Sequence, residues 1–277
     1  MTVILNTNYG AVVSSKNLAD NERAMNRVVE KISSGKKTIH ARDDAAGIAI
    51  AGRMESQIRG LTTAIQHAKE GKSLATTTEG SLQEITDVLQ KMRELAVHSA
   101  SGTANNSDKD YLNLEMSNLV SQIESISLNS SLNGNQLLRG EQFTFFTDMD
   151  VSGANITTIS ADMAVTTLGV PISTVNVGAG VNQSDLDDVV SAIDSAISLV
   201  STKRADLGAV SNRFDHIIGN LQTVINNTVR SKGIMINADY AVETTKLTRS
   251  NILQQGATSM LAQANSQKNL VLSLFQQ

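Results

Sequence analysis

The stretch 193-IDSAISLVSTKRADLGAVSNRFDHIIGNLQTVINNT-228 carries a repeat whose steps alternate between four and three residues. Its positions are Ile193, Ile197, Val200, Arg204, Leu207, Ser211, Phe214, Ile218, Leu221, Ile225 and Thr228. These steps keep one seam of a long helix facing a partner helix. Val210, Ile217 and Val224 widen the seam, so we expect more than one neighbouring helix. Ser184 with Asp187 resembles a capping box and predicts the start of this helix.

Three further helices with the same spacing precede this stretch. Their apolar positions are Met54, Ile58, Leu61, Ile65 and Ala68, then Leu82, Ile85, Leu89, Met92 and Ala96, then Leu112, Met116, Leu119, Ile123 and Ile126. Asp43 and Asp44 lie where the first of these helices should begin, which favours its dipole. The polar stretch 101–107 should separate the second helix from the third, with Ser107 as N-cap.

Both ends of the chain are also helical by pattern. Leu18, Met25 and Ile32 lie seven residues apart, and the helix they form should end at Ser33-Ser34-Gly35. Near the other end, the apolar spacing runs through Leu253, Ala257, Met260, Ala264, Gln267, Val271 and Leu274. Each terminal stripe would stay exposed without a partner. The two ends can pair with each other, and other copies can cover the rest, which predicts self-assembly.

The character of the sequence changes between about residues 134 and 182. Asn133-Gly134 is a turn signal, and residues 142–147 alternate as in a strand. The runs 156–159 and 175–177 are also β-prone. We therefore expect a mainly α fold of long, coiled-coil-like helices forming a rod, interrupted by a small β-hairpin insert.

The composition excludes several classes of protein. Aromatic residues make up only 3% of the 277 residues, there is one proline and there is no cysteine. The net charge is −4 with mixed signs, so we expect no nucleic-acid partner. No run of 18 apolar residues exists, so we expect no membrane span, and the N-terminus does not resemble a signal peptide.

No constellation of catalytic or metal-binding residues is evident. The four histidines, His40, His67, His98 and His216, are scattered without metal-ligand spacing. Asp43-Asp44 suits helix capping better than catalysis, because adjacent helical residues diverge by about 100°. We therefore expect no enzyme activity, no cofactor and no metal.

Several long motifs resemble those of one family and occur in its order. They are 33-SSGKKTIHARDDAAGIAIA-51, 77-TTEG-80, 89-LQKMRELAV-97, 204-RADLGAVSNRF-214, 238-ADYA-241 and 252-ILQQGATSMLAQAN-265. Through these motifs the chain resembles bacterial flagellin over nearly all its length outside the β insert. The resemblance implies a structural subunit that polymerises into the extracellular flagellar filament used for swimming.

The resemblance also implies a map of the chain. Residues 1–36 and 237–277 would pair as a coiled coil in the filament's inner core, and residues 37–236 would form the rod with the β insert. Subunit contacts would involve Leu18, Met25, Ile32, Leu253, Met260, Val271 and Leu274. Partners would be other copies, an export chaperone, and the cap and junction proteins. Export would follow the flagellar type III route, without a cleaved signal peptide.

A further implied partner is the animal Toll-like flagellin receptor. By family match its contacts would be Gln90, Lys91, Leu95 and Glu115, with Lys91 standing where the family has arginine. Two other functions stay open at this point. The first is a hook–filament junction protein, a relative with similar ends. The second is a cytoplasmic coiled-coil signalling protein, although the β insert and the break near Ser107 disfavour it.

Overall fold

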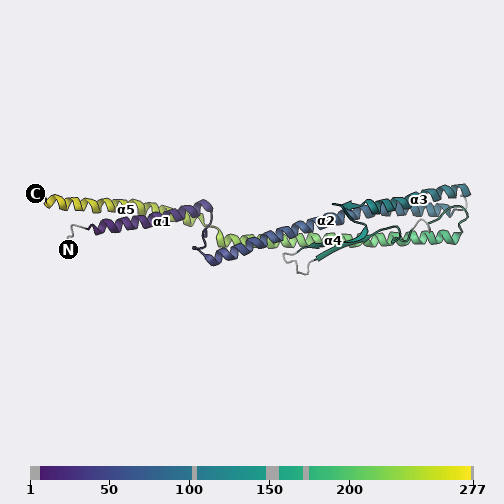
Figure 1. Cartoon of the computed structure of the whole chain (residues 1–277), viewed down its shortest axis with the longest axis horizontal. Helices are drawn as coiled ribbons and strands as arrows, with labels where there is room; N and C mark the ends of the chain where they lie inside the picture. The colour runs from purple at the N-terminus through teal and green to yellow at the C-terminus, as the bar shows by residue number, and fades with distance from the viewer. Residues whose placement is uncertain (1–6, 102–104, 148–155, 171–174, 276–277) are drawn as a thin grey trace. The chain divides into compact units, whose positions relative to one another are not determined.

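A computed structural model describes residues 7–101, 105–147, 156–170 and 175–275, except for the side chains of 156–158 and 268–275. The helices are α1 (Tyr9–Ser34), α2 (Ala45–Ser99), α3 (Asn106–Asn129), α4 (Gln183–Ile236) and α5 (Tyr240–Phe275). The strands are β1 (Ser131–Leu132), β2 (Asn135–Gln136), β3 (Arg139–Phe146) and β4 (Ile156–Asp162) (Figure 1). The predicted mainly α fold with a small β insert is confirmed.

The chain divides into two compact units. Unit 1 consists of Met1–Ser56 and Asn227–Gln277, and unit 2 is Gln57–Asn226. The boundaries expected from the sequence, 36 and 237, instead coincide with the end of α1 and the joint between α4 and α5. Both unit 1 segments are thus somewhat longer than the terminal segments marked out by the motifs.

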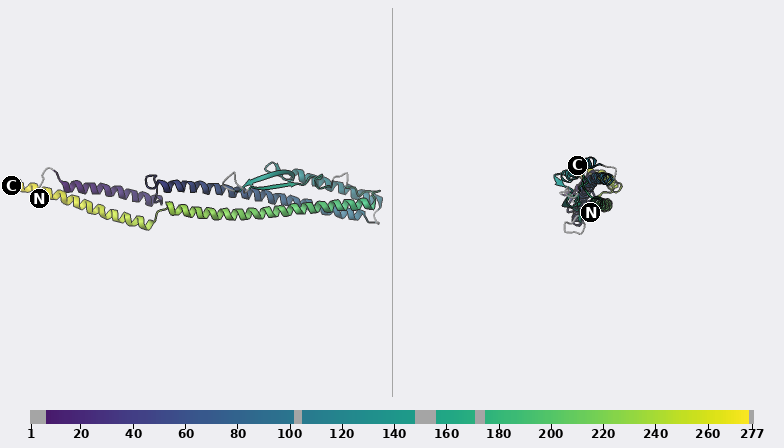
Figure 2. Two further views of the ribbon diagram at one scale, coloured as in Figure 1. Left: turned by 90° about the horizontal axis from the view of Figure 1, so that it is seen from below. Right: turned by 90° about the vertical axis from the view of Figure 1, so that its right-hand side faces the viewer.

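Helix α4 has the repeat that its sequence predicts. In unit 2, Ile193, Val200, Leu207, Phe214 and Leu221 are all buried, seven residues apart. The residues between these positions on the seam are half-buried, as a helix that contacts its neighbours along one stripe requires. Helix α4 runs beside α2 (Figure 2), and the buried residues of its repeat cluster with buried residues of α2. The ion pairs Lys72–Asp215, Glu79–Arg204 and Arg93–Asp194 follow the antiparallel order of the two helices.

Helix α2 is one helix, although its sequence reads as two. The spacing breaks between Ala68 and Leu82, but the backbone continues because Leu74, Ala75 and Thr78 fill the gap as buried residues. The hydroxyl of Thr78 donates to the carbonyl oxygen of Leu74 at 2.8 Å, so its burial leaves no polar group unsatisfied.

Two predicted helix caps lie two residues too late. Asn105, not Ser107, caps α3 in a capping box with Asp108, whose carboxylate accepts from the Asn105 amide. Helix α4 begins at Gln183, and its first turn carries Asp185, not Asp187, in the position that accepts from the Asn182 amide. At the start of α3 the asparagine upstream therefore takes the capping position expected for the serine.

The β insert packs on the helices of unit 2. Asn133 and Gly134 both have positive φ (52° and 85°) and form the two-residue turn between β1 and β2. Strands β3 and β4 are antiparallel, and Phe143 and Phe145 turn toward the core while their neighbours are exposed. The run 175–177 is β-prone by sequence, but it forms no strand. Its amides and carbonyls bond instead to side chains, including Asn113 and Ser99.

Unit 1 is built on the pairing of α1 with α5 (Figure 2). Gly35 ends α1 in the left-handed conformation (φ 68°), as predicted. Just beyond it, the amide of Ala238 donates to Gly35 and the amide of Lys37 donates to Ile236, at 2.9 and 2.8 Å. An antiparallel bridge between Lys36 and Asn237 lies between these bonds and joins the segment after α1 to the segment between α4 and α5.

Candidate self-assembly surfaces

The seam between α1 and α5 is regular but only partly apolar. On α1, every residue of the facing stripe is half-buried: Ala11, Ser14, Leu18, Asn21, Met25, Val28 and Ile32. On α5 the facing stripe is Glu243, Leu247, Ser250, Gln254, Ala257, Leu261 and Ala264. Two side-chain amides bridge the helices, Asn21 to the carbonyl of Ser250 at 2.8 Å and Asn8 to that of Ala264 at 3.0 Å. The structure therefore brings Leu18, Met25 and Ile32 together with α5.

The apolar stripe expected on α5 lies mostly on another face. Leu253 and Met260 are 52% and 64% exposed, and Ile252 beside them is 64% exposed. The sequence pattern predicts a single seam, but among the members of that set whose side chains the structure describes, only Ala257 and Ala264 face α1. The side chains of Val271 and Leu274 lie outside the described residues. An outward apolar face on a paired helix is free to contact another molecule.

The exposed face continues onto α1. Tyr9 and Val12 are exposed, and a shallow groove of about 400 Å³ runs between Tyr9, Val13, Ala257 and Met260. The groove is therefore lined by residues of both α1 and α5. Unit 1 therefore presents apolar surface along both of its terminal helices.

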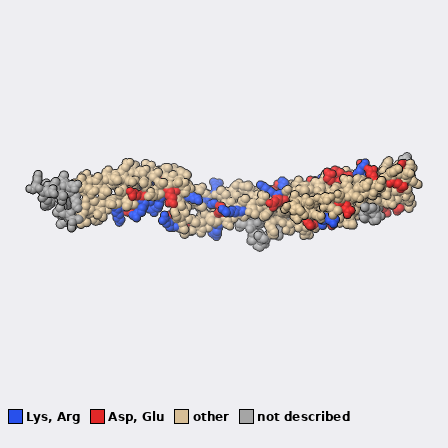
Figure 3. Space-filling view, turned by 45° about the horizontal axis from the view of Figure 1, so that its top comes forward, with Lys and Arg blue, Asp and Glu red and all other residues tan. Residues whose placement is uncertain are grey.

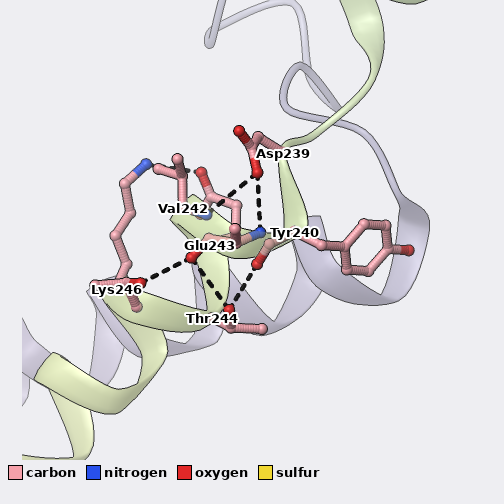
Figure 4. Close-up of polar contacts among 8 residues, drawn as sticks. Asp239, Tyr240, Val242, Glu243, Thr244 and Lys246 are labelled. Carbon is pink, nitrogen blue, oxygen red and sulfur yellow. Dashed lines mark hydrogen bonds and ion pairs between the residues drawn. The ribbon is translucent and has the colours of Figure 1, made fainter.

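The joint between α4 and α5 holds a cluster of polar contacts that sequence reasoning missed. Asp239 caps α5 by accepting from the amides of Ala241 and Val242 (Figure 4). Glu243 is only 5% exposed; its Oε1 accepts from Lys246 at 2.7 Å, and its Oε2 has no hydrogen-bond partner among the described residues. A buried carboxylate at this position has no signature in the sequence, because glutamate in the first turn of a helix usually faces solvent.

The loop before α2 is held by its aspartates. Asp44 caps the helix by accepting from Gly47 at 2.8 Å, which confirms its expected role. Asp43 instead accepts from the amides of His40 and Ile39 within the loop. The bond from His40 is the main cause that lowers the pKa of Asp43, with help from the charge of Arg42. Asp43 thus fastens the loop and is not a cap of α2.

The stretch matched to receptor recognition lies on α2 of unit 2. Gln90 and Lys91 are exposed, and Lys91 pairs with Glu94 at 3.4 Å. Glu115 is exposed on α3. Leu95, however, is 6% exposed and belongs to the hydrophobic core, so its side chain is not presented to a partner.

The same stretch contains an ion pair to the neighbouring helix. Arg93 donates from Nε to Asp194 of α4 at 2.6 Å, and this hydrogen bond raises the pKa of Arg93. Arg93 is therefore engaged in joining α2 to α4. Among the residues that the structure describes, no three acidic, histidine or cysteine side chains come together as a metal site. In the same part of the chain, no helix is both long and apolar enough to cross a membrane.

Comparison with known proteins agrees with this arrangement. Residues 5–143 match the model of the bacterial flagellin N-terminal helical region, and residues 190–275 match that of the bacterial flagellin C-terminal helical region. Flagellins of Halalkalibacterium halodurans and Bacillus subtilis are each 35% identical to the chain. The alignments cover 99% of this chain and 100% of the first relative, and 98% and 99% for the second.

A solved structure of a putative flagellar hook-associated protein from Vibrio parahaemolyticus is similar with a TM-score of 0.60, over 70% of this chain and 99% of that one. At 14% identity this likeness shows the shared fold alone. The two family models, by contrast, together span more than half of the chain. The chain therefore belongs to the bacterial flagellin family, the self-assembling structural subunits of the filament used for swimming, and it is not an enzyme.

Proposed function

We propose that the α1–α5 pair forms the inner part of the filament and that copies join through the outward apolar face of this pair. In this proposal residues 1–36 and 237–277 make the inner core, and residues 37–236 form the rod around it. The observation that carries the proposal is the exposure of Ile252, Leu253 and Met260 on a helix that already has an intramolecular partner.

Burial of this face contributes to the free energy of association between subunits. Fully burying one exposed large apolar side chain contributes roughly 1.5–3 kcal/mol. Because Ile252, Leu253 and Met260 are 64%, 52% and 64% exposed, burying the rest of all three contributes roughly 3–5 kcal/mol for each subunit. Part of this gain offsets the loss of translational and rotational freedom. The polymer repeats the same contact at every subunit, which suits an open assembly.

One substitution tests the proposal directly. Leu253→Asp places a charge in the proposed interface, at a cost of several kcal/mol when it is buried without a partner. Asn251→Asp is the matched control, because it adds the same charge at an exposed position of α5 that lies about 100° or more around the helix from Ile252, Leu253 and Met260. Electron microscopy should show filaments for the wild-type protein and for the control, but not for Leu253→Asp. Normal filaments from Leu253→Asp would refute the proposed interface.

The location and the other partners belong to the same proposal. We infer that the subunit leaves the cell through the flagellar export channel without a cleaved signal peptide. Export chaperone, cap and junction proteins would then cover the apolar faces of α1 and α5 before polymerisation. The absence of cysteine supports this route, because no disulfide can form before export. Deleting the flagellar export gate should leave the intact protein in the cell fraction, whereas blocking the general secretion pathway should not.

A second activity is recognition by the Toll-like flagellin receptor. The exposure of Gln90, Lys91 and Glu115 in unit 2 supports it. Leu95 would act from within the core by holding α2 in place. A binding titration of the monomer against the receptor ectodomain tests this activity.

A further inference from the structure

The charges of this chain are divided unequally between its two units. Unit 1 carries 13 basic and 8 acidic residues, whereas unit 2 carries 10 basic and 19 acidic residues. The net charges are therefore +5 and −9, although the whole chain has a net charge of only −4. Such a division gives each copy two surfaces of opposite sign.

The negative charge concentrates at one end of unit 2, which we call the acidic tip. It consists of residues 84–99 of α2, 106–124 of α3 and 183–194 of α4, with eleven acidic and three basic residues. The ion pair of Arg93 with Asp194 joins α2 to α4. The amide of Ala179, four residues before α4 begins, donates to Asp110 of α3. Figure 3 shows acidic side chains gathered over this end of unit 2.

Several acidic side chains of the acidic tip make no polar contact within the described part of the subunit. Asp108 and Asp185 serve the starts of α3 and α4. Glu84, Glu124 and Asp188, in contrast, are exposed and make no hydrogen bond or ion pair with any described residue. Helix capping therefore accounts for only part of the charge.

The positive charge of unit 1 concentrates at the joint described above. The basic joint consists of residues 31–44 and 229–249, with eight basic and four acidic residues. The backbone bonds between Gly35 and Ala238 and between Lys37 and Ile236 hold the two segments together. All four acids are engaged internally, Asp43, Asp44 and Asp239 with amides and Glu243 with Lys246.

Fewer of the basic side chains of the basic joint have partners within the subunit. Lys36, Arg230 and Arg249 are exposed and form no side-chain hydrogen bond or ion pair with the residues that the structure describes. The acidic tip and the basic joint therefore each carry unpaired charges, and the charges are of opposite sign.

Each surface also carries exposed apolar side chains among its charges. In the acidic tip they are Val97, Tyr111 and Leu114, and in the basic joint they are Ile234, Tyr240 and Val242. Apolar residues surrounded by charged ones are the usual composition of a protein interface. The two surfaces thus carry charges of opposite sign and share exposed apolar side chains.

We propose that the basic joint of one copy docks on the acidic tip of another copy in the filament. This rests on the proposed function, because it names two surfaces through which polymerising subunits meet. Contacts between two tips or between two joints are repulsive, so only the head-to-tail arrangement is favoured. A head-to-tail contact uses a different surface on each partner and leaves one of each free, which permits open growth.

The test measures elongation from sheared wild-type filaments with full-length monomers. The tip variant is Glu84→Lys, Glu124→Lys and Asp188→Lys, and the joint variant is Arg230→Glu and Arg249→Glu. The matched control, Glu70→Lys, Glu141→Lys and Asp206→Lys, makes the same charge change in unit 2 outside the acidic tip. Circular dichroism and thermal melting identify the variants that fold, and the milder Glu84→Gln with Asp188→Asn replaces a tip variant that does not.

We expect elongation at low salt to fall at least about tenfold for the tip and joint variants and to change little for the control. Adding salt should narrow the difference in elongation rate between these variants and the wild-type protein, because salt screens the attraction. The combined tip-and-joint variant should be slowed by less than the product of the two separate effects, because each removes the same attraction.

Wild-type rates in the tip or joint variant, an equal slowing in the control, or fully multiplicative effects in the combination would each overturn the docking proposal. The proposed function is tested separately by the same assay. It fails if wild-type monomers do not elongate the filaments at all.

Discussion

The ring of Phe214 in α4 occupies the space that a side chain at position 71 of α2 would need. A Cβ added to Gly71 would lie 2.4 Å from Cζ of Phe214, well inside any allowed contact. Phe145 of β3 meets the same ring edge-on, with centroids 5.9 Å apart. One fully buried aromatic ring therefore joins α2, α4 and the β insert in a chain that has few aromatic residues.

Replacing Gly71 with alanine should destabilise unit 2. The added methyl group must displace the Phe214 ring, and such overpacking costs about 1–3 kcal/mol. Gly208→Ala and Gly219→Ala are matched controls, because neither added methyl meets another atom within 4 Å. Alanine at these helical positions should stabilise by up to about 1 kcal/mol. Thermal melting measures all three, and a Gly71→Ala protein as stable as the controls would contradict the packing argument.

The cap of α3 provides a second comparison. Asn105→Ala removes the side-chain acceptor of the Asp108 amide and should cost about 1 kcal/mol. Ser107→Ala, two residues later, should change stability by less than about 0.5 kcal/mol. Urea unfolding of both variants decides between the two residues. A larger loss of stability for Ser107→Ala than for Asn105→Ala would show that Ser107 is the N-cap.

The terminal helices should be the least stable part of the monomer. No residue of α1 is fully buried, and the α1–α5 seam includes Ser250 and Gln254. A thin, partly polar seam gives little protection against local unfolding. Limited proteolysis should remove residues before about 35 and after about 237 from monomers but not from filaments. Equal resistance of the two forms would show that assembly adds no protection.

Receptor recognition depends on the chemistry of position 91. Lysine keeps the positive charge but lacks the planar fork of arginine, which makes bidentate and stacked contacts. Lys91→Arg should therefore tighten binding of the monomer to the receptor. Lys69→Arg, at another exposed position of α2, is the control and should leave affinity unchanged. An unchanged or weaker affinity for Lys91→Arg would show that the fork is not used.

The sequence predicts the long helices well where one face alone is buried. The repeat from Ile193 to Leu221 is a single stripe, and every seventh residue of it is buried. Prediction was poorer where side chains compete for backbone groups. Asn105 and Ser107 are both acceptable caps, and only the reciprocal bond with Asp108 decides between them.

The assembly surfaces are harder to predict for a different reason. Apolar spacing identifies a stripe but not the molecule that covers it. In α5 the polar residues Ser250 and Gln254 face α1, whereas Leu253 and Met260 face outward. Ordinary experience would place the apolar residues inside the subunit. In a protein that polymerises, the strongest stripe can equally be kept for a neighbour.

The pairing of the two ends has a consequence for timing. Asn8 bonds to the carbonyl of Ala264, 256 positions later in the sequence. Because a chain is synthesised from its N-terminus, α1 is among the first segments made and waits for almost the last before it finds its partner. A prematurely ended chain therefore cannot complete unit 1. If growth of the filament requires that pair, each position in it is open only to a subunit that has been made in full.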